Sequence, residues 1–283
     1  MASKKIKIDI ADGVGTITLD RPEKMNAVDT AMLYEIIEAF DECDGNDEIK
    51  AIVVTGEGRA FCAGAELGGA DGNFLEPGHD AGAVVRDVGG LLTLRLFDMK
   101  KPVIAAVNGA AVGMGASMLL PMDYCIASDK AKFGFVFTRR GIVTESNSSY
   151  FLPRVVGIRK ALDWCMTGRV FGPEEALQAG LISQICSPEE LLETAYKLAH
   201  DIIDNTAPIS VALTRQMLWK GLGWDHPMEA HKWESRGVSS RAASADAEEG
   251  VASFLEKRPA KFPLEISKDM PDFYPWWTDR EYS

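Results

Sequence analysis

Glycine-rich turns that follow apolar runs are the features of this 283-residue chain with the clearest chemical potential. The run at residues 103–107 leads into Asn-Gly-Ala-Ala-Val-Gly-Met-Gly-Ala-Ser at residues 108–117, where a helix of small residues is expected to begin. The first N–H groups of a helix have no partner inside the helix and carry partial positive charge. They can therefore stabilise the negative oxygen that forms when a carbonyl group reacts.

Other glycine motifs fit these letters less well. The dinucleotide-binding pattern Gly-x-Gly-x-x-Gly would start at Gly113, and it fails at Met118. A phosphate-binding loop needs Gly-Lys followed by Ser or Thr, which the turn lacks. The nucleophile pattern Gly-x-Ser-x-Gly fails because Leu119 stands at its last position. Taken alone, the glycines are equally well explained by close packing of a helix on a strand.

A similar turn, which comes first along the chain, favours a functional role. Residues 59–67 read Arg-Ala-Phe-Cys-Ala-Gly-Ala-Glu-Leu and follow another apolar run at residues 51–55. Turns beyond the carboxyl ends of neighbouring parallel strands face one crevice. Each turn can offer one backbone N–H, and two such donors aimed at one carbonyl oxygen form an oxyanion hole.

The elements that must position these turns can be predicted from periodicity. Alternating residues on both sides of Asp12-Gly13 predict a hairpin over residues 6–10 and 14–19. Further strands are expected at residues 51–55, 103–107, 124–128 and 182–185, and helices at residues 29–44, 84–99 and from the second turn to Met122. Helices that alternate with strands predict parallel strands joined by crossing helices.

The last third of the chain reads differently. Helices are expected at residues 188–205, 208–222, 227–244 and 247–257, and an extended tail at residues 259–283 that packs on a surface or on another subunit. We therefore predict an α/β core over residues 1–185, which holds the active site, and a helical region with an extended tail over residues 186–283.

In combination, five motifs resemble the crotonase superfamily, which is the enoyl-CoA hydratase/isomerase family. They lie at residues 19–27, 61–67, 108–115, 162–181 and 254–258, and the resemblance spans roughly residues 6–262. It implies a crotonase-like spiral of ββα units with a helical C-terminal trimerisation region. It also implies a homotrimer or a hexamer that acts on acyl-CoA thioesters.

The resemblance further implies which residues meet the ligand. The thioester oxygen would accept hydrogen bonds from the N–H groups of Ala65 and Met114. The CoA moiety would lie against Lys24, Ala27, Ala63, Ala65 and Leu67, with Phe254 and Lys257 approaching from a neighbouring subunit. No cofactor beyond the CoA moiety of the substrate is expected.

The acid–base residues depart from the pattern of the family's hydratases, which carry two glutamates. Ser117 stands at the first of these positions and Phe137 at the second. Phenylalanine cannot transfer a proton, and serine has no suitable pKa unaided. Glu145 remains, at the position where dienoyl-CoA isomerases and aromatic-CoA dehalogenases of the family place a catalytic aspartate. Its alternative role is to cap a helix that begins near residues 146–148.

The sequence thus favours an acyl-CoA enzyme of the hydratase/isomerase type, in which Glu145 moves protons beside the oxyanion hole. A single carboxylate fits double-bond isomerisation best, since it can take a proton and return it. Hydration stays possible if Glu145 activates water. Two further alternatives stay open: a CoA-ester-binding or scaffold protein without hydratase activity, and a dehalogenase or C–C hydrolase.

Composition sets the outer limits. A net charge of −12 argues against nucleic acid or an anionic membrane as the main partner. The histidines His79, His200, His226 and His231 form no metal-binding motif, so no metal site is expected. The N-terminus lacks the apolar segment of a signal peptide, and the five cysteines are widely spaced. We therefore expect a cytoplasmic protein with reduced thiols.

Overall fold

Two β-sheets built from alternating strands of the chain form the centre of the fold. The computed structural model describes residues 5–66 and 86–282. The larger sheet has the order β1-β2-β3-β5-β7-β10, with strands Ile6–Ala11, Val14–Leu19, Ala51–Gly56, Val103–Val107, Tyr124–Ser128 and Gln184–Cys186. The smaller has the order β4-β6-β8-β9, with strands Ala60–Cys62, Ala110–Val112, Lys132–Gly134 and Val170–Phe171.

Along the chain, strands of the larger sheet alternate with strands of the smaller sheet. Strands β3, β5 and β7 are parallel neighbours in the larger sheet, and each is followed within a few residues by β4, β6 or β8, which are parallel neighbours in the smaller sheet. A helix then leads to the next pair of strands. This repetition is the spiral of ββα units that the sequence predicts, and it brings the β3–β4 and β5–β6 connections side by side.

Helices cover the sheets and complete the core. They are α1 (Thr30–Gly45), α2 (Val88–Phe97), α3 (Met114–Ser117), α4 (Ser148–Val156), α5 (Ile158–Thr167), α6 (Pro173–Gln178) and α7 (Leu191–Ile203), with single turns η1 (Pro22–Lys24), η2 (Phe137–Arg140) and η3 (Pro188–Glu190). Helix α1 begins at Asp29, whose side chain accepts the N–H of Met32 at 2.8 Å. The helix buries its apolar face, which includes Met32, Leu33 and Phe40.

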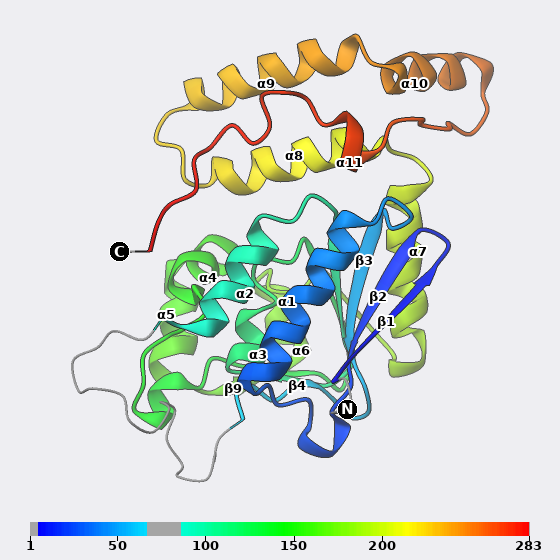
Figure 1. The fold of residues 1–283 in the computed structure, drawn as a ribbon. Helices are drawn as coiled ribbons and strands as arrows, with labels where there is room; N and C mark the ends of the chain where they lie inside the picture. The colour runs from blue at the N-terminus through cyan, green and yellow to red at the C-terminus, as the bar shows by residue number, and fades with distance from the viewer. Residues whose placement is uncertain (1–4, 67–85, 283) are drawn as a thin grey trace.

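The C-terminal helices form a separate layer over one end of the sheets (Figure 1). They are α8 (Pro208–Gly221), α9 (Pro227–Ala242), α10 (Ala245–Glu256) and the short α11 (Ile266–Asp269). After α11 the chain runs back extended between α8 and α9, where Trp276 stacks on Trp233 with ring centroids 5.7 Å apart. No helix of the described residues is long and apolar enough to cross a membrane.

Most predicted elements are present, with two informative differences. The helix after the second turn ends at Ser117 instead of Met122. Pro121 lies in the segment that had been expected to be helical, and proline does not support a helix interior. Helix α7 packs Leu191, Ala195 and Ala199 against the larger sheet, although it follows residue 185. The division of the chain at that residue stays a prediction.

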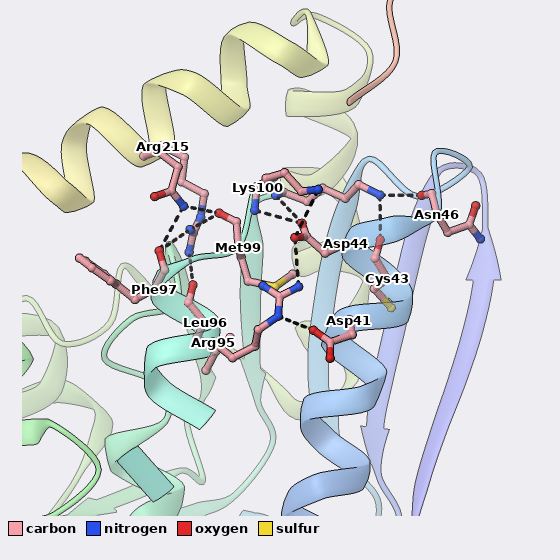
Figure 2. A network of polar contacts seen from close by, with 12 residues as sticks. Asp41, Cys43, Asp44, Asn46, Arg95, Leu96, Phe97, Met99, Lys100 and Arg215 are labelled. Carbon is pink, nitrogen blue, oxygen red and sulfur yellow. Dashed lines mark hydrogen bonds and ion pairs between the residues drawn. The ribbon is translucent and has the colours of Figure 1, made fainter. Parts of the chain in front are cut away.

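A buried arginine joins the helical layer to the core. Figure 2 shows Arg215 of α8 beside the last turn of α2, where its guanidinium donates to the carbonyl of Leu96 at 2.9 Å. It also donates to Phe97, Met99 and Pro121 carbonyls, and it pairs with Asp123 at 2.8 Å. These acceptors include C-terminal carbonyls of a helix, which have no partner inside the helix. Arg215 is 6% exposed, so water cannot replace it.

Replacing Arg215 should therefore be costly. Arg215→Ala is expected to lower the free energy of unfolding by about 3–5 kcal/mol, because it leaves the largely buried Asp123 carboxylate without its counter-charge and removes a donor from the Leu96 and Pro121 carbonyls. Urea titration at one fixed protein concentration measures this change. Lys130 pairs with Asp129 at an exposed site, so Lys130→Ala should cost less than about 1 kcal/mol. Equal costs for the two variants would contradict the assigned role of Arg215.

Candidate active site

The two glycine-rich turns are in direct backbone contact. Gly64 has φ +104° and Gly113 has φ +57°, values that L side chains rarely adopt. A Cβ on Gly64 would lie 2.8 Å from the carbonyl oxygen of Val112 and 3.8 Å from the Cα of Gly113. Glycine is therefore required at Gly64 both for its conformation and for lack of space. The pairing of β4 with β6 brings the two turns to this distance.

Each turn presents one N–H that its own structure leaves free. Ala65 forms a parallel bridge with Val28, in which Val28 donates to the Gly64 carbonyl and Glu66 donates to the Val28 carbonyl. The N–H of Ala65 itself therefore points to the other side. Met114 is the first residue of α3, and its N–H precedes every intrahelical bond. Within residues 5–66 and 86–282, neither N–H has an acceptor.

Asparagine side chains hold both turns in place. Asn108 accepts the N–H of Gly56 at 3.2 Å and donates to the carbonyls of Gly58 and Ala60. Asn26, which is fully buried, donates to the carbonyls of Glu57 and Ala60 at 3.0 and 2.8 Å. The two side chains therefore fix the β3–β4 connection from both sides, which keeps Ala65 and Met114 in register.

A buried carboxylate lies near these turns. Glu145 precedes α4, and its Oε2 lies 3.0 Å from the position that a Cβ on Gly89 would occupy. Burial and, as a smaller cause, the negative charge of Asp87 together raise the pKa of the Glu145 carboxyl to about 7. Burial raises the pKa of the Cys62 thiol on β4, and the charge of Glu145 raises it in the same direction.

The Glu145 side chain is not used as a helix cap. Helix α4 starts at Asn147 without a side-chain cap, and it is the backbone carbonyl of Glu145 that accepts the N–H of Ser148, at 3.0 Å. Its Oε1 is buried and has no hydrogen-bond partner in the described part of the chain. Buried polar atoms are normally paired. An unpaired carboxylate oxygen with a pKa near 7 is suited to proton transfer.

The two positions that lack a glutamate are also buried. Phe137 is 4% exposed and lies against the second turn, with a ring carbon 3.8 Å from the Cβ position of Gly113. Ser117, on α3, is fully buried, and its hydroxyl has no partner among the described residues. The structure therefore supplies two backbone donors and one carboxylate capable of titrating near neutral pH.

Comparison with known proteins identifies this arrangement. A family model described as enoyl-CoA hydratase/isomerase matches residues 9–264. The chain belongs to that family. An enoyl-CoA hydratase of Alternaria alternata is 41% identical over 89% of this chain and 83% of its own length. The 1,2-epoxyphenylacetyl-CoA isomerase of Escherichia coli is 33% identical over 89% and 96%. A solved enoyl-CoA hydratase of Bacillus anthracis superimposes with a TM-score of 0.82 at 28% identity, covering 91% and 98%.

These similarities confirm the predicted crotonase fold and an enzyme of the enoyl-CoA hydratase/isomerase type. They include both hydratases and an isomerase, so the family alone does not select the reaction. The roles of individual residues stay predictions and are argued below from the geometry of this chain.

The residues predicted to bind CoA lie around the first turn. Ala63 donates its N–H to the carbonyl of Met25 at 3.0 Å, and Ala27 accepts from Arg21 at 2.9 Å. The Lys24 ammonium, half exposed, pairs with Glu66 at 3.3 Å. Leu67 lies outside the described residues, as does His79.

Glu66 interacts with residues close to it in the structure. Its carboxylate binds Arg21 at 2.7 Å as well as Lys24, and these contacts lower the pKa of Glu66. The Arg21 guanidinium also lies 3.3 Å from Asp29. This network joins the loop before α1 to the residue that follows Ala65. Because Glu66 is occupied in this way, it is not a second free carboxylate for the reaction.

Phe254 and Lys257 are far from the first turn in this chain. Both belong to the end of α10 in the outer helical layer, whereas β4 lies at the opposite end of the molecule (Figure 1). Phe254 is 81% exposed. A single chain therefore does not bring these residues to the site, and their predicted role depends on a neighbouring subunit.

Several other polar and aromatic side chains have structural partners. Asp163 and Glu175 both bind Arg169, at 2.6 Å and 2.5 Å, and the Trp164 indole donates to Glu175 at 2.9 Å. Trp233 packs on Trp276 of the tail. Among the described residues, no group of three His, Cys, Asp or Glu side chains could hold a metal ion.

Sequence reasoning missed Asp87 as a neighbour of Glu145. An aspartate before the apolar run that begins at Val88 is a signal for a helix N-cap, and its Oδ1 does accept the N–H of Gly89 at 2.9 Å. Its second bond, from the N–H of Ser146 at 2.6 Å, joins residues 59 positions apart. No local pattern predicts such a contact.

A small change at the first turn should disable the site. Gly64→Ala is expected to reduce turnover about 10²-fold or more, because the new Cβ displaces the turn that carries the Ala65 donor. Steady-state rates with an enoyl-CoA substrate measure the loss. Gly180 provides the matched control, since its φ is +79° and its nearest neighbouring atom would be 3.8 Å from a new Cβ. Gly180→Ala should cost stability and leave turnover unchanged.

Proposed function

We propose that this enzyme isomerises the double bond of an enoyl-CoA thioester through an enolate held between the N–H groups of Ala65 and Met114. Two observations together carry this proposal: Glu145 has a buried carboxylate oxygen with no partner among the described residues, and two touching backbone turns each present a free N–H. The carboxylate removes a proton from the α or γ carbon. The negative charge moves onto the thioester oxygen, where both N–H groups donate to it.

The same geometry supports isomerisation over hydration. Hydration needs a base to activate water and an acid to protonate the enolate, and the family's hydratases use two glutamates for this. Phe137 and Ser117 stand at those positions here, and neither supplies an acid. Isomerisation needs only one group that takes a proton and returns it. With a pKa of about 7, Glu145 can do both near neutral pH. The reaction needs no cofactor beyond the CoA moiety of the substrate.

We also infer that the complete CoA site forms between subunits. Phe254 and Lys257 lie at the end of α10, beside Val251 and Leu255, which are 61% and 73% exposed. Exposed apolar side chains that cluster on one helix are typical of protein interfaces. A homotrimer or hexamer that brings α10 to the first turn of a neighbouring chain would cover them and supply a lysine to the CoA phosphates.

Substitution of the carboxylate tests the assignment directly. Glu145→Gln keeps the size of the side chain and removes its basicity, so turnover should fall by about 10²-fold or more while the affinity for the CoA ester changes little. Single-turnover rates and a separate binding titration measure the two effects. Glu193→Gln, an exposed change on α7, is the control and should behave as wild type. Near wild-type turnover of Glu145→Gln would refute the proposed mechanism.

The pH dependence follows from the state of Glu145. A base must be ionised to accept a proton, so kcat/KM should be constant above pH 7 and fall as the pH drops below about 7. An ordinary glutamate with a pKa of 4.5 would place this fall more than two units lower. A rate profile between pH 4 and 9 measures the inflection. An inflection near 4.5 would show that the active carboxylate is not the buried Glu145.

Analysis of products in deuterated water separates the candidate reactions. Isomerisation of a 3-enoyl-CoA gives a 2-enoyl-CoA of unchanged mass apart from exchanged hydrogen, whereas hydration adds the elements of water. Binding of 2-enoyl-, 3-enoyl- and 3-hydroxyacyl-CoAs without turnover of any of them would instead favour a CoA-ester-binding protein of the same fold.

A further inference from the structure

The segment that carries Glu145 is attached to the start of α2 at several points. Asp87 accepts the N–H of Gly89 with one carboxylate oxygen, at 2.9 Å, and the N–H of Ser146 with the other, at 2.6 Å. One side chain therefore caps α2 and holds the residue next to Glu145. The bonds are directed to the backbone, so they fix where the chain runs and not only one side-chain rotamer.

Asn147 forms a second, uncharged attachment. Its amide donates to the carbonyl of Gly90 at 3.0 Å and to the hydroxyl of Thr93 at 2.8 Å. Ser146 and Asn147 both have left-handed backbones, with φ of 53° and 55°. Two consecutive non-glycine residues in this region are strained. The contacts with α2 supply the interactions that keep the segment in this conformation.

Close packing leaves no room for the segment to shift toward α2. A Cβ on Gly89 would lie 2.1 Å from the Ser146 hydroxyl, 3.0 Å from Glu145 Oε2 and 3.3 Å from Asp87 Oδ1. The carboxylates of Asp87 and Glu145 thus share the surface of one glycine. On β4, burial raises the pKa of the Cys62 thiol to about 12, so this thiol is uncharged at neutral pH. Among the described residues, Asp87 is the charged group that acts on Glu145.

We propose that Asp87 is a positioning residue for Glu145. Asp87 holds the 145–147 segment on the start of α2 and keeps a negative charge beside the Glu145 carboxylate. This proposal rests on the proposed function of Glu145 as the proton-transfer group. It assigns two effects to Asp87 that experiments can separate. The hydrogen bonds fix the location of Glu145, and the charge sets the pH range in which Glu145 is protonated.

The variant Asp87→Asn separates charge from size. Removing the negative charge favours ionisation of Glu145, so the fall of kcat/KM at acid pH should move downward by ~0.5 pH unit or more, towards the ordinary glutamate value of 4.5. The rate on the plateau should also decrease by about 10-fold, because the Asn side chain cannot accept both N–H groups. A purely structural role would lower the plateau and leave the inflection near pH 7.

Asn147→Gly is the matched control. Glycine tolerates the left-handed backbone, and the change removes the uncharged attachment while the charge of Asp87 stays. We expect a lower plateau rate and an inflection that does not move. If Asp87→Asn fails to fold, Asp87→Ser retains an N-cap oxygen without the charge and should show the same downward shift. An unmoved inflection in the charge-removing variant that folds would overturn the proposal.

A measurement without turnover separates this proposal from the function that it rests on. The infrared carboxyl band of Glu145, obtained as the difference between wild type and Glu145→Gln, can be followed during a pH titration. We expect its midpoint to fall in Asp87→Asn relative to wild type. An unchanged midpoint refutes the role of Asp87, whereas full activity of Glu145→Gln refutes only the catalytic role of Glu145.

Discussion

The contact between the backbones of the Gly64 and Gly113 turns is the constraint on which the site depends. Two peptide N–H groups can share one oxygen only if their chains approach closely, and a Cβ at Gly64 would prevent this because it would lie 2.8 Å from the carbonyl oxygen of Val112. The spiral of ββα units brings the turns together because β4 and β6 are parallel neighbours. Asn26 and Asn108 then hold the first turn by donating to its carbonyls. Much of the surrounding polar structure serves to keep these two segments at a fixed separation.

Because the donors are backbone groups, the chemistry next to them can vary independently. Ser117 and Phe137 stand where the family's hydratases carry glutamates, and the two turns are in contact at Gly64 and Gly113. The change removes proton-transfer groups and leaves the means of stabilising an enolate intact. The burial that raises the pKa of Glu145 then gives one carboxylate the range to act as both base and acid. A single fold can in this way support several reactions that share one intermediate.

The sequence alone predicts the strands, the order of the core elements and the positions of both turns in the chain, since these depend on local periodicity and on glycine. It also predicts Glu145 as the proton-transfer group, from the two positions where carboxylates are missing, and the burial of its unpaired Oε1 supports this prediction. It could not reveal the attachment of Ser146 and Asn147 to α2, which depends on contacts between segments more than 50 residues apart. The predicted helix is longer than α3 because Met118, Leu119 and Leu120 suit a helix, whereas Pro121 does not support a helix interior.

Helix α2 lies between the segment that carries Glu145 and the outer helical layer. Its first turn holds the Glu145 segment through Asp87 and Asn147, and its last turn is held by Arg215 of α8 in the outer helical layer. Ten residues of helix span about 15 Å and bend little over that length. The helical layer and the reacting carboxylate are thus joined through one stiff element. The placement of Glu145 and the packing of the C-terminal helices therefore both depend on contacts of this one helix.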